Sequence, residues 1–453
     1  MDLSARGAPM SDQESQYPKP AYAWYMVVLL LIIYTFSFID RQILGLLGPA
    51  IKADFGISDT YFGLLTGPAF AIFYATFGLY CARIADSKSR KWLIAIGLFL
   101  WSLMTAASAL ARSFMMLFLF RIGVGVGEAT LGPAANSMLS DSFPKKKLAM
   151  ALSIYAMGIP IGSALAFYIG GTVIELAAEL PAVIIPGFGA VTDWQKSLLL
   201  VGIPGILLTF FVIALKEPSR KGTTGGGKSI SVTETFVFFK ARARAYLSIY
   251  LGVSMIAALG FSTLIFLTFF FYRFHGLQPA EIGKTFGMIS IVTGPVGLLL
   301  GGYLADRWYR QGHKDAHMRA LLVAPLGYLI PSLIFPLLSD TTLTWWVLGV
   351  SNAFINLASG VAYAGLQLIT PNQMRGQAAA GFIVSTNLIG YGAGPLVLGM
   401  MTDYVFMDPM KLNYALVLLA AITTPAAIIL LQWGRKAFAQ ALVEEETRLT
   451  NMS

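Results

Sequence analysis

Twelve long apolar stretches constrain the fold of this chain more than any other feature. A transmembrane helix needs about 20 consecutive, mostly apolar residues. Hydrophobic residues make up 56% of the chain and charged residues 12%, against about 25% charged residues in soluble domains. We therefore predict an all-α integral membrane protein. Its twelve transmembrane helices are expected at residues 22–48, 59–82, 92–110, 114–140, 148–174, 196–215, 246–272, 282–304, 318–338, 343–368, 377–400 and 412–433.

The basic residues are distributed unevenly between the two sets of connections. The net charge is +9, which by itself would also suit a nucleic-acid partner. Most of the 32 Lys and Arg residues, however, fall in the tails and in alternate connections, while the opposite loops hold only Lys52, Arg112, Lys196, Arg273, Lys284 and Lys411. This asymmetry is the positive-inside pattern of membrane proteins. It predicts cytoplasmic termini, contact with membrane lipids and no nucleic-acid partner.

The residue types that bind metals or perform covalent catalysis are scarce. Cys81 is the single cysteine, and the three histidines all lie in predicted connections. We therefore expect no disulfide, no metal site, no bound cofactor and no enzymatic activity. Residues 1–20 are polar and lead directly into the first span, so we expect no cleavable signal peptide.

The longest connection divides the chain into two halves of six spans. We predict an N-terminal tail at residues 1–21, a first bundle at 22–215, a linker at 216–245, a second bundle at 246–433 and a C-terminal tail at 434–453. Within the linker, Gly222 to Ser229 matches the letters of a phosphate-binding loop. No soluble α/β domain surrounds that match, so we interpret it as flexible linker.

Four charged residues lie inside apolar spans. Asp40 and Arg41 belong to the first span, and Arg121 and Glu128 to the fourth. A charge at bilayer depth costs at least about 2.5–3.5 kcal/mol, and such residues usually line a pathway or cavity. Neighbours in a helix point about 100° apart, so Asp40 and Arg41 each need a partner elsewhere. From the helical rise we expect a ladder, with Asp40 and Arg41 in the outer third, Arg121 near the middle and Glu128 in the inner third.

This arrangement predicts proton coupling and anion binding. A buried carboxyl changes protonation when an Arg nearby moves or binds an anion, so we assign proton coupling to Asp40 and Glu128. An Arg side chain binds two oxygens of a phosphate or carboxylate at once, so we assign substrate binding to Arg41 and Arg121. In an alternative interpretation, the four residues pair permanently and lock helices 1 and 4 together.

The second half offers uncharged polar residues within its spans. We assign substrate binding there to Asn352, Asn356, Tyr363 and Asn387; Ser262, Thr263, Thr293, Gln367 and Tyr391 are further cavity candidates. Hydrogen bonds between helices are the alternative role for such side chains. A charged first half facing a more apolar second half would suit an amphipathic substrate.

A short motif recurs after the second span of each half. The first copy contains Ala85-Asp86 followed by Arg90, and the second contains Ala305-Asp306-Arg307. We predict a cytoplasmic gate made of Asp86, Arg90, Asp141, Asp306 and Arg307. In it Arg90 pairs with Asp141, and the two motif aspartates approach helix N-termini of the opposite half. Solvated loop charges are the alternative interpretation.

These motifs resemble those of a known family. The second copy, Gly302 to Arg307, resembles the loop signature of the major facilitator superfamily, and Arg121 with the glycines after it resembles that superfamily's fourth-span motif. The run from Arg121 to Ala129, with Asp40-Arg41, Trp101-Ser102-Leu103 and Ile159 to Ser163, looks like the spinster branch. The resemblance implies two six-helix bundles working by alternating access, with a lysophospholipid or a lipid like sphingosine 1-phosphate as cargo.

Taken together, the residues and the resemblance predict a proton-coupled transporter of an amphipathic anionic lipid. A symporter of a small organic anion such as a sugar acid, or an exporter of hydrophobic drugs, are the alternatives that remain. The short loops and tails look like those of a bacterial member of the family. We therefore expect a monomer in the bacterial inner membrane, with both termini in the cytoplasm.

Overall fold

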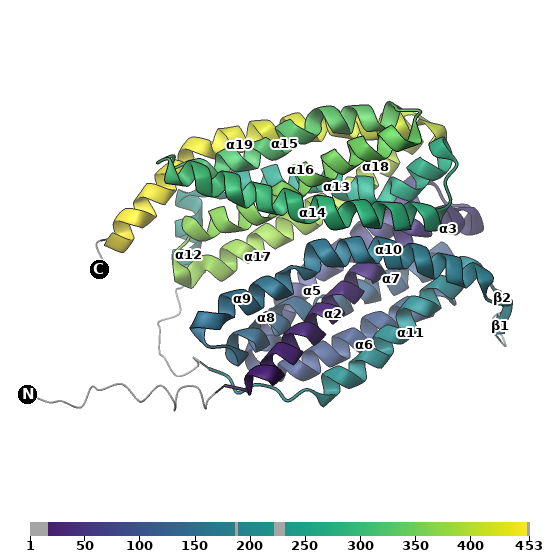
Figure 1. Ribbon diagram of the computed structural model, residues 1–453, viewed down its shortest axis with the longest axis horizontal. Helices are drawn as coiled ribbons and strands as arrows, with labels where there is room; N and C mark the ends of the chain where they lie inside the picture. The colour runs from purple at the N-terminus through teal and green to yellow at the C-terminus, as the bar shows by residue number, and fades with distance from the viewer. Residues whose placement is uncertain (1–16, 186–188, 222–231, 451–453) are drawn as a thin grey trace, which may run out of the picture.

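The computed structural model describes residues 17–185, 189–221 and 232–450 (Figure 1). Nearly all of them are helical. Helices (α), 3-10 or π segments (η) and strands (β) follow in the order α2 (Pro20–Leu46), α3 (Gly48–Phe55), α4 (Asp59–Thr66), α5 (Pro68–Ser87), α6 (Arg90–Ser108), α7 (Phe114–Glu128), α8 (Leu131–Ser142), α9 (Lys145–Ala156), α10 (Gly158–Glu179), β1 (Val183–Ile185), β2 (Gly189–Val191), α11 (Asp193–Ala214), α12 (Val232–Ala241), α13 (Ala243–His275), α14 (Pro279–Arg310), α15 (Ala316–Ile334), η1 (Phe335–Leu337), α16 (Thr341–Leu368), η2 (Asn372–Met374), α17 (Arg375–Ser385), η3 (Thr386–Ala393), α18 (Gly394–Met400), η4 (Met401–Val405), η5 (Pro409–Lys411) and α19 (Leu412–Thr450).

The predicted spans are confirmed. Within the described residues, 12 helices are long and apolar enough to cross a membrane, and each overlaps one predicted span. Spans 2, 4, 5 and 11 each consist of consecutive shorter helices. The break in span 2 falls at Gly67-Pro68, where Pro68 opens α5. Proline has no N–H to donate to the preceding turn, so a new helix begins there.

Two segments are helical outside the predicted spans. The last span continues without a break as the 39-residue helix α19, well past the predicted end at 433. Its extension is rich in Ala, Glu, Arg and Leu, which are strong helix formers. The linker contains the helix α12, and the match from Gly222 to Ser229 lies outside the described residues.

The helices form two bundles, drawn one above the other in Figure 1. The N-terminal half comprises α2 to α11, and the C-terminal half comprises α13 to α19. The described chain begins and ends at one end of the molecule, which we call the terminus-side end. The antiparallel hairpin of β1 and β2 lies at the other, the hairpin-side end.

The two halves pack closely toward the hairpin-side end. A Cβ atom at Gly63 of α4 would overlap the Pro395 carbonyl of α18, and one at Gly283 of α14 would lie 2.7 Å from the Phe167 carbonyl of α10. Only glycine permits backbones to approach this closely.

Candidate functional site

An ion pair between the first and fourth spans forms the centre of the candidate site. Arg41 Nε of α2 donates a hydrogen bond of 2.6 Å to Glu128 Oε2 at the end of α7. The Glu128 side chain is fully buried and the Arg41 side chain is 11% exposed. The pairing confirms that Arg41 finds its partner on another helix.

The ladder of charges predicted from the sequence is wrong in the depth that it gives to Glu128. Glu128 lies at the centre of the span Phe114–Ser142 and not in its inner third. In addition, each Cα–Cβ bond tilts toward the N-terminus of its own helix. Since spans 1 and 4 run in opposite directions, the Arg41 and Glu128 side chains lean toward each other. The Arg41 and Glu128 side chains therefore meet at nearly one level.

The Arg121 side chain contacts the backbone of the first span. Its Nη1 donates a 3.0 Å hydrogen bond to the Asp40 carbonyl oxygen, and its Nη2 donates a long, 3.4 Å bond to the Tyr391 hydroxyl of the C-terminal half. Its Nε is buried without a partner. Arg121 thus keeps hydrogen-bonding capacity that no described residue uses.

The Asp40 carboxyl lacks a cationic partner among the described residues. The residue is 2% exposed, and its Oδ1 makes no hydrogen bond. The Thr105 hydroxyl and the Trp101 indole of α6 lie beside this carboxyl, but neither makes a hydrogen bond of normal geometry. Asp40 and Glu128 therefore differ in environment, since Glu128 is ion-paired and Asp40 is not.

Aromatic rings surround the two guanidinium groups. The Arg41 guanidinium carbon lies 4.7 Å from the centre of the Phe70 ring and 4.8 Å from that of Tyr74, and the Arg121 carbon lies 5.0 Å from Phe70. Ring faces attract cations, more strongly where water is excluded. Phe70 of α5 therefore helps to hold both arginines in place.

The glycines after Arg121 allow the close packing of span 4. A Cβ at Gly125 would lie 2.8 Å from the Phe70 carbonyl of α5, and one at Gly127 would lie 2.8 Å from the Gly97 carbonyl of α6. These contacts bring α5 and α6 against α7, which places Phe70 and Trp101 at the charges.

The four substrate-binding candidates of the second half do not join the charged cluster. Asn352 donates to Thr293 Oγ1 at 2.8 Å, Asn356 donates to the Asn352 carbonyl at 2.8 Å, and Asn387 donates to the Ile383 carbonyl at 2.8 Å. Asn356 and Asn387 thus bond within their own helices, and Asn352 joins α16 to α14.

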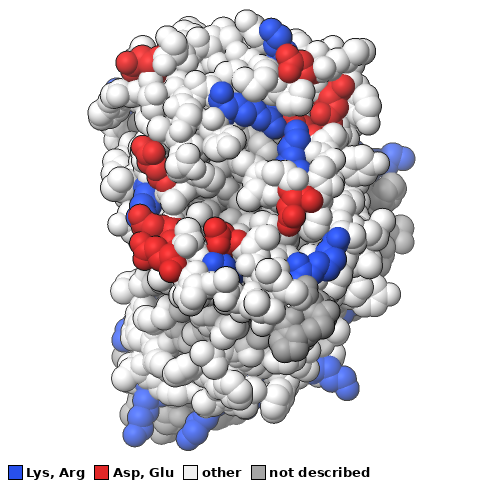
Figure 2. All heavy atoms as spheres, turned by 90° about the vertical axis from the view of Figure 1, so that its right-hand side faces the viewer, with Lys and Arg blue, Asp and Glu red and all other residues white. Residues whose placement is uncertain are grey.

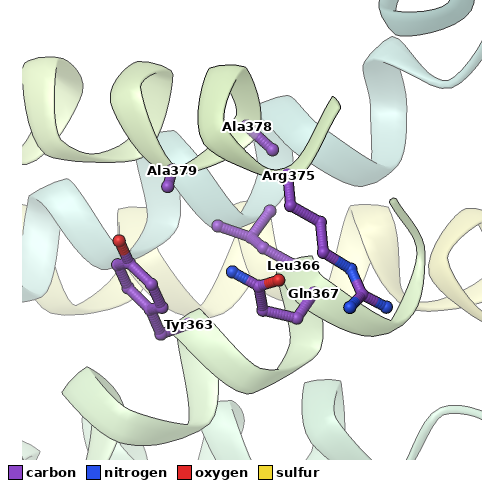
Figure 3. Close-up of a pocket in the computed structure, with 6 residues that line it drawn as sticks. All are labelled: Tyr363, Leu366, Gln367, Arg375, Ala378 and Ala379. Carbon is purple, nitrogen blue, oxygen red and sulfur yellow. The ribbon is translucent and has the colours of Figure 1, made fainter. Parts of the chain in front are cut away.

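Tyr363 lies in a shallow pocket between α16 and α17. Figure 3 shows it on the same side as Gln367, facing the segment of α17 that carries Arg375. The lining residues are Tyr363, Leu366, Gln367, Arg375, Ala378 and Ala379. None of the four membrane charges lines this pocket. A residue of the C-terminal half that does reach the membrane charges is Tyr391, which contacts Arg121. Sequence reasoning placed Tyr391 among the further cavity candidates but not in the site.

At the terminus-side end, the predicted pair of Arg90 and Asp141 is present. Arg90 Nη1 donates to Asp141 Oδ2, and Arg90 Nε donates to Glu217 Oε1 at 3.1 Å. Burial alone would raise the pKa of Glu217, but hydrogen bonds from Ser89 and Arg90 lower it below its usual value. All of these residues belong to the N-terminal half and the start of the linker, so the pair does not itself join the halves.

The other predicted gate residues are exposed. Asp86 accepts a hydrogen bond from Arg220 through its backbone carbonyl, and the Asp306 carbonyl accepts one from Arg310 at 3.4 Å. The side chains of Asp86, Asp306 and Arg307 lie on the surface. In this conformation the described contacts of both aspartates stay within their own half.

Sequence reasoning missed a charged cluster at the hairpin-side end. Asp59 of α4 is fully buried, and its carboxylate accepts hydrogen bonds of 2.8 and 2.9 Å from Arg273 of α13 and one from Lys52. Nearby, the Thr60 backbone N–H donates to Asp403 Oδ2 at 2.7 Å. These contacts join the two halves. Figure 2 shows this end, where acidic and basic side chains are interspersed. Asp59 and Arg273 stand 214 positions apart, and no local signal links them.

The described residues contain no group of three or more His, Cys, Asp or Glu side chains placed to hold a metal ion. Carboxyl groups in such a cluster can gain or lose a proton, and guanidinium groups can bind an anion.

Comparison with known proteins identifies relatives over almost the whole chain. A model of the Major Facilitator Superfamily matches residues 30–395. An MFS-type efflux pump of Mycolicibacterium smegmatis is 28% identical over 98% of this chain and 100% of its own length. The protein spinster of Drosophila melanogaster is 24% identical over 84% of this chain, which spans 62% of that protein. A hexuronate transporter of Bacillus subtilis is 24% identical over 83% of this chain and 87% of its own length.

A solved structure shares the fold. It is a bacterial homologue of the human lysosomal transporter spinster in an inward-facing, unoccupied conformation, 26% identical, with a TM-score of 0.77 over 94% of this chain and 99% of that one. The predicted resemblance to the spinster branch is thus confirmed.

Proposed function

Because the chain belongs to the Major Facilitator Superfamily and has the fold of its transporters, we propose that it is a proton-coupled secondary transporter of an amphipathic anionic lipid. Its cargo is a lysophospholipid or a lipid like sphingosine 1-phosphate, moved by alternating access of the two halves. The cargo assignment follows the similarity to spinster proteins and the chemistry of the cluster.

The unequal pairing of the four membrane charges carries this proposal. Arg41 and Glu128 neutralise each other, while Arg121 keeps an unused donor and the Asp40 carboxyl has no ion-pair partner among the described residues. A buried carboxylate without a partner is strongly unfavourable and takes up a proton instead. With Asp40 neutral, the cluster carries one net positive charge, which suits a single anionic headgroup.

The two halves would bind different parts of an amphipathic molecule. Charged and aromatic groups come from the N-terminal half, whereas the Asn and Thr side chains of α14 and α16 bond to each other. We assign the headgroup to Arg41 and Arg121 and the acyl chain to the C-terminal half, where Tyr363 and Asn387 line its path.

Alternating access follows from the distribution of contacts between the halves. The ion pairs of Asp59 and Glu175 with the opposite half lie toward the hairpin-side end. With both termini in the cytoplasm, as the positive-inside pattern predicts, this conformation faces inward. In the outward-facing state, Asp86, Asp306 and Arg307 would close the cytoplasmic side. The transporter works as a monomer in the bacterial inner membrane.

Two of the relatives bear on the alternatives. The hexuronate transporter supports a small organic anion, which could bind the same two arginines. The efflux pump supports export as the direction of transport; a hydrophobic drug without negative charge would leave Arg121 without a ligand. The lipid remains our first choice because it uses both the charge and the apolar face.

The test is proton flux in liposomes that contain the purified protein and carry a pH gradient. We add lysophosphatidate or sphingosine 1-phosphate, with glucuronate in parallel. Flux with the lipid that is lost in Asp40→Asn is expected, while the surface variant Asp193→Asn, whose side chain is 63% exposed, keeps it. Flux with glucuronate alone would move the assignment to the sugar acid.

A further inference from the structure

Tyr391 links the charged cluster of the N-terminal half to the otherwise uncharged face of the C-terminal half. It is 2% exposed, and its hydroxyl accepts the 3.4 Å hydrogen bond from Arg121. Its ring lies 5.3 Å from Phe70 of α5 and 4.9 Å from Phe261 of α13, measured between ring centres. The ring is therefore held between the halves while its hydroxyl points at a guanidinium group.

The free donors of Arg121 define where an anion can bind. Nη1 is occupied by the Asp40 carbonyl, whereas Nε has no partner and Nη2 has only the long contact with Tyr391. Nε and Nη2 lie along one edge of the planar guanidinium, the edge that binds two oxygens of a phosphate or carboxylate side by side. Nη2, one end of this edge, contacts the Tyr391 hydroxyl.

The backbone that carries Tyr391 is unusual. It belongs to the π-helical segment η3 in span 11, and π segments occur frequently at functional sites. On one side, a Cβ at Gly392 would lie 3.1 Å from Ala71 of α5; on the other, one at Gly390 would lie 2.6 Å from Ala257 of α13. The segment that carries Tyr391 is therefore packed against both halves.

We propose that Tyr391 is a specificity-determining residue, which binds the anionic headgroup together with the Nε–Nη2 edge of Arg121. The anion enters between the two side chains, replaces their weak contact and accepts the hydroxyl proton of Tyr391 as a hydrogen bond. Span 11 thereby senses whether Arg121 is occupied. This inference rests on the proposed function, because it requires an anionic substrate at Arg121.

The test compares Tyr391→Phe with wild type in binding assays on the purified, full-length protein. Phenylalanine keeps the ring between Phe70 and Phe261 and removes only the hydroxyl. A hydrogen bond to a charged group contributes enough that we expect lysophosphatidate binding to weaken about tenfold or more. Binding of monoacylglycerol, which has the same acyl chain without the charge, should be unchanged.

The matched control is Tyr328→Phe, at a fully buried tyrosine of the same half whose hydroxyl makes no hydrogen bond to a described residue. It should bind lysophosphatidate like wild type. Thermal unfolding of both variants checks that the fold is intact. Glucuronate is tested in parallel, so that the two variants can still be compared if the cargo is a sugar acid and not a lipid. If wild type binds an anion and Tyr391→Phe binds it equally well, this inference alone is overturned. If wild type binds neither anion, the proposed function is overturned with it.

Discussion

Arg41 and Glu128 form a buried ion pair of 2.6 Å between spans 1 and 4, covered by the rings of Phe70 and Tyr74. Removing one partner of such a pair leaves the other charge buried and uncompensated. Replacing both by apolar residues of similar size is often tolerated. This difference separates a functional pair from a purely structural lock.

Glu128→Gln is expected to destabilise the protein by about 3–5 kcal/mol, because Arg41 then lacks a counter-charge. It should also change the pH dependence of transport. The double variant Arg41→Met, Glu128→Leu should recover stability without recovering transport. Thermal unfolding in detergent and uptake by liposomes measure both quantities. Transport by the double variant would show that the pair only locks helices 1 and 4.

Asp59→Asn is expected to open the hairpin-side end. The fully buried Asp59 carboxylate compensates Lys52 and Arg273, so its loss leaves two cations without their counter-ion. A cysteine at Phe62, introduced into a Cys81→Ser background, should then react several-fold faster with a thiol reagent. Phe62 is buried against Phe269 of the opposite half.

Glu175→Gln is the matched control for this variant. Glu175 also pairs across the halves, with Lys284, but the two side chains are 53% and 31% exposed. Exposed pairs contribute roughly 0–1 kcal/mol, so the labelling rate should hardly change. Equal labelling in Asp59→Asn and Glu175→Gln would rule out the buried cluster as the contact that holds this end closed.

The contact of Glu217 with Arg90 should depend on pH. Because the pKa of Glu217 is lowered in the folded protein, its stabilising effect is present above the ordinary glutamate value of about 4.3 and is lost as the pH falls through the lower, folded value. Glu217→Gln should therefore lower the melting temperature at neutral pH, and this difference should shrink as the pH falls below about 4. The exposed Glu444→Gln is the control. If the melting temperatures of wild type and Glu217→Gln differed by the same amount at every pH, the Glu217 carboxylate would not be the group that stabilises this contact.

Gly127→Ala and Gly123→Ala test the close packing of span 4. The new Cβ at position 127 meets backbone atoms of α6 at 2.8 Å, whereas the one at position 123 meets the flexible Met104 side chain. We expect Gly127→Ala to cost about 1–3 kcal/mol and Gly123→Ala clearly less. Unfolding temperatures measure the difference. Equal effects would mean that the two glycines have the same role.

Local patterns in the sequence predicted much of the fold. The twelve spans were found because hydrophobicity over about 20 residues is sufficient to define a transmembrane helix. The pairing of Arg90 with Asp141 was also predicted, since both residues lie next to recognisable span ends. The four membrane charges were identified as the site because charge is rare at such depth.

The partners of these charges could not be predicted. Which group meets Arg41 depends on the rotation of two helices and on the opposite tilt of their side chains, and a linear estimate of depth contains neither. The contact between Arg121 and Tyr391 spans 270 positions and depends on a π-helical segment, and Asp59 meets Arg273 only because the halves close at one end. Hydrophobicity and charge along the chain are enough to predict which residues lie in the membrane and which of them are costly to bury. Which buried charge is neutralised and which remains available depends on the folded protein, because contacts between distant helices make that choice.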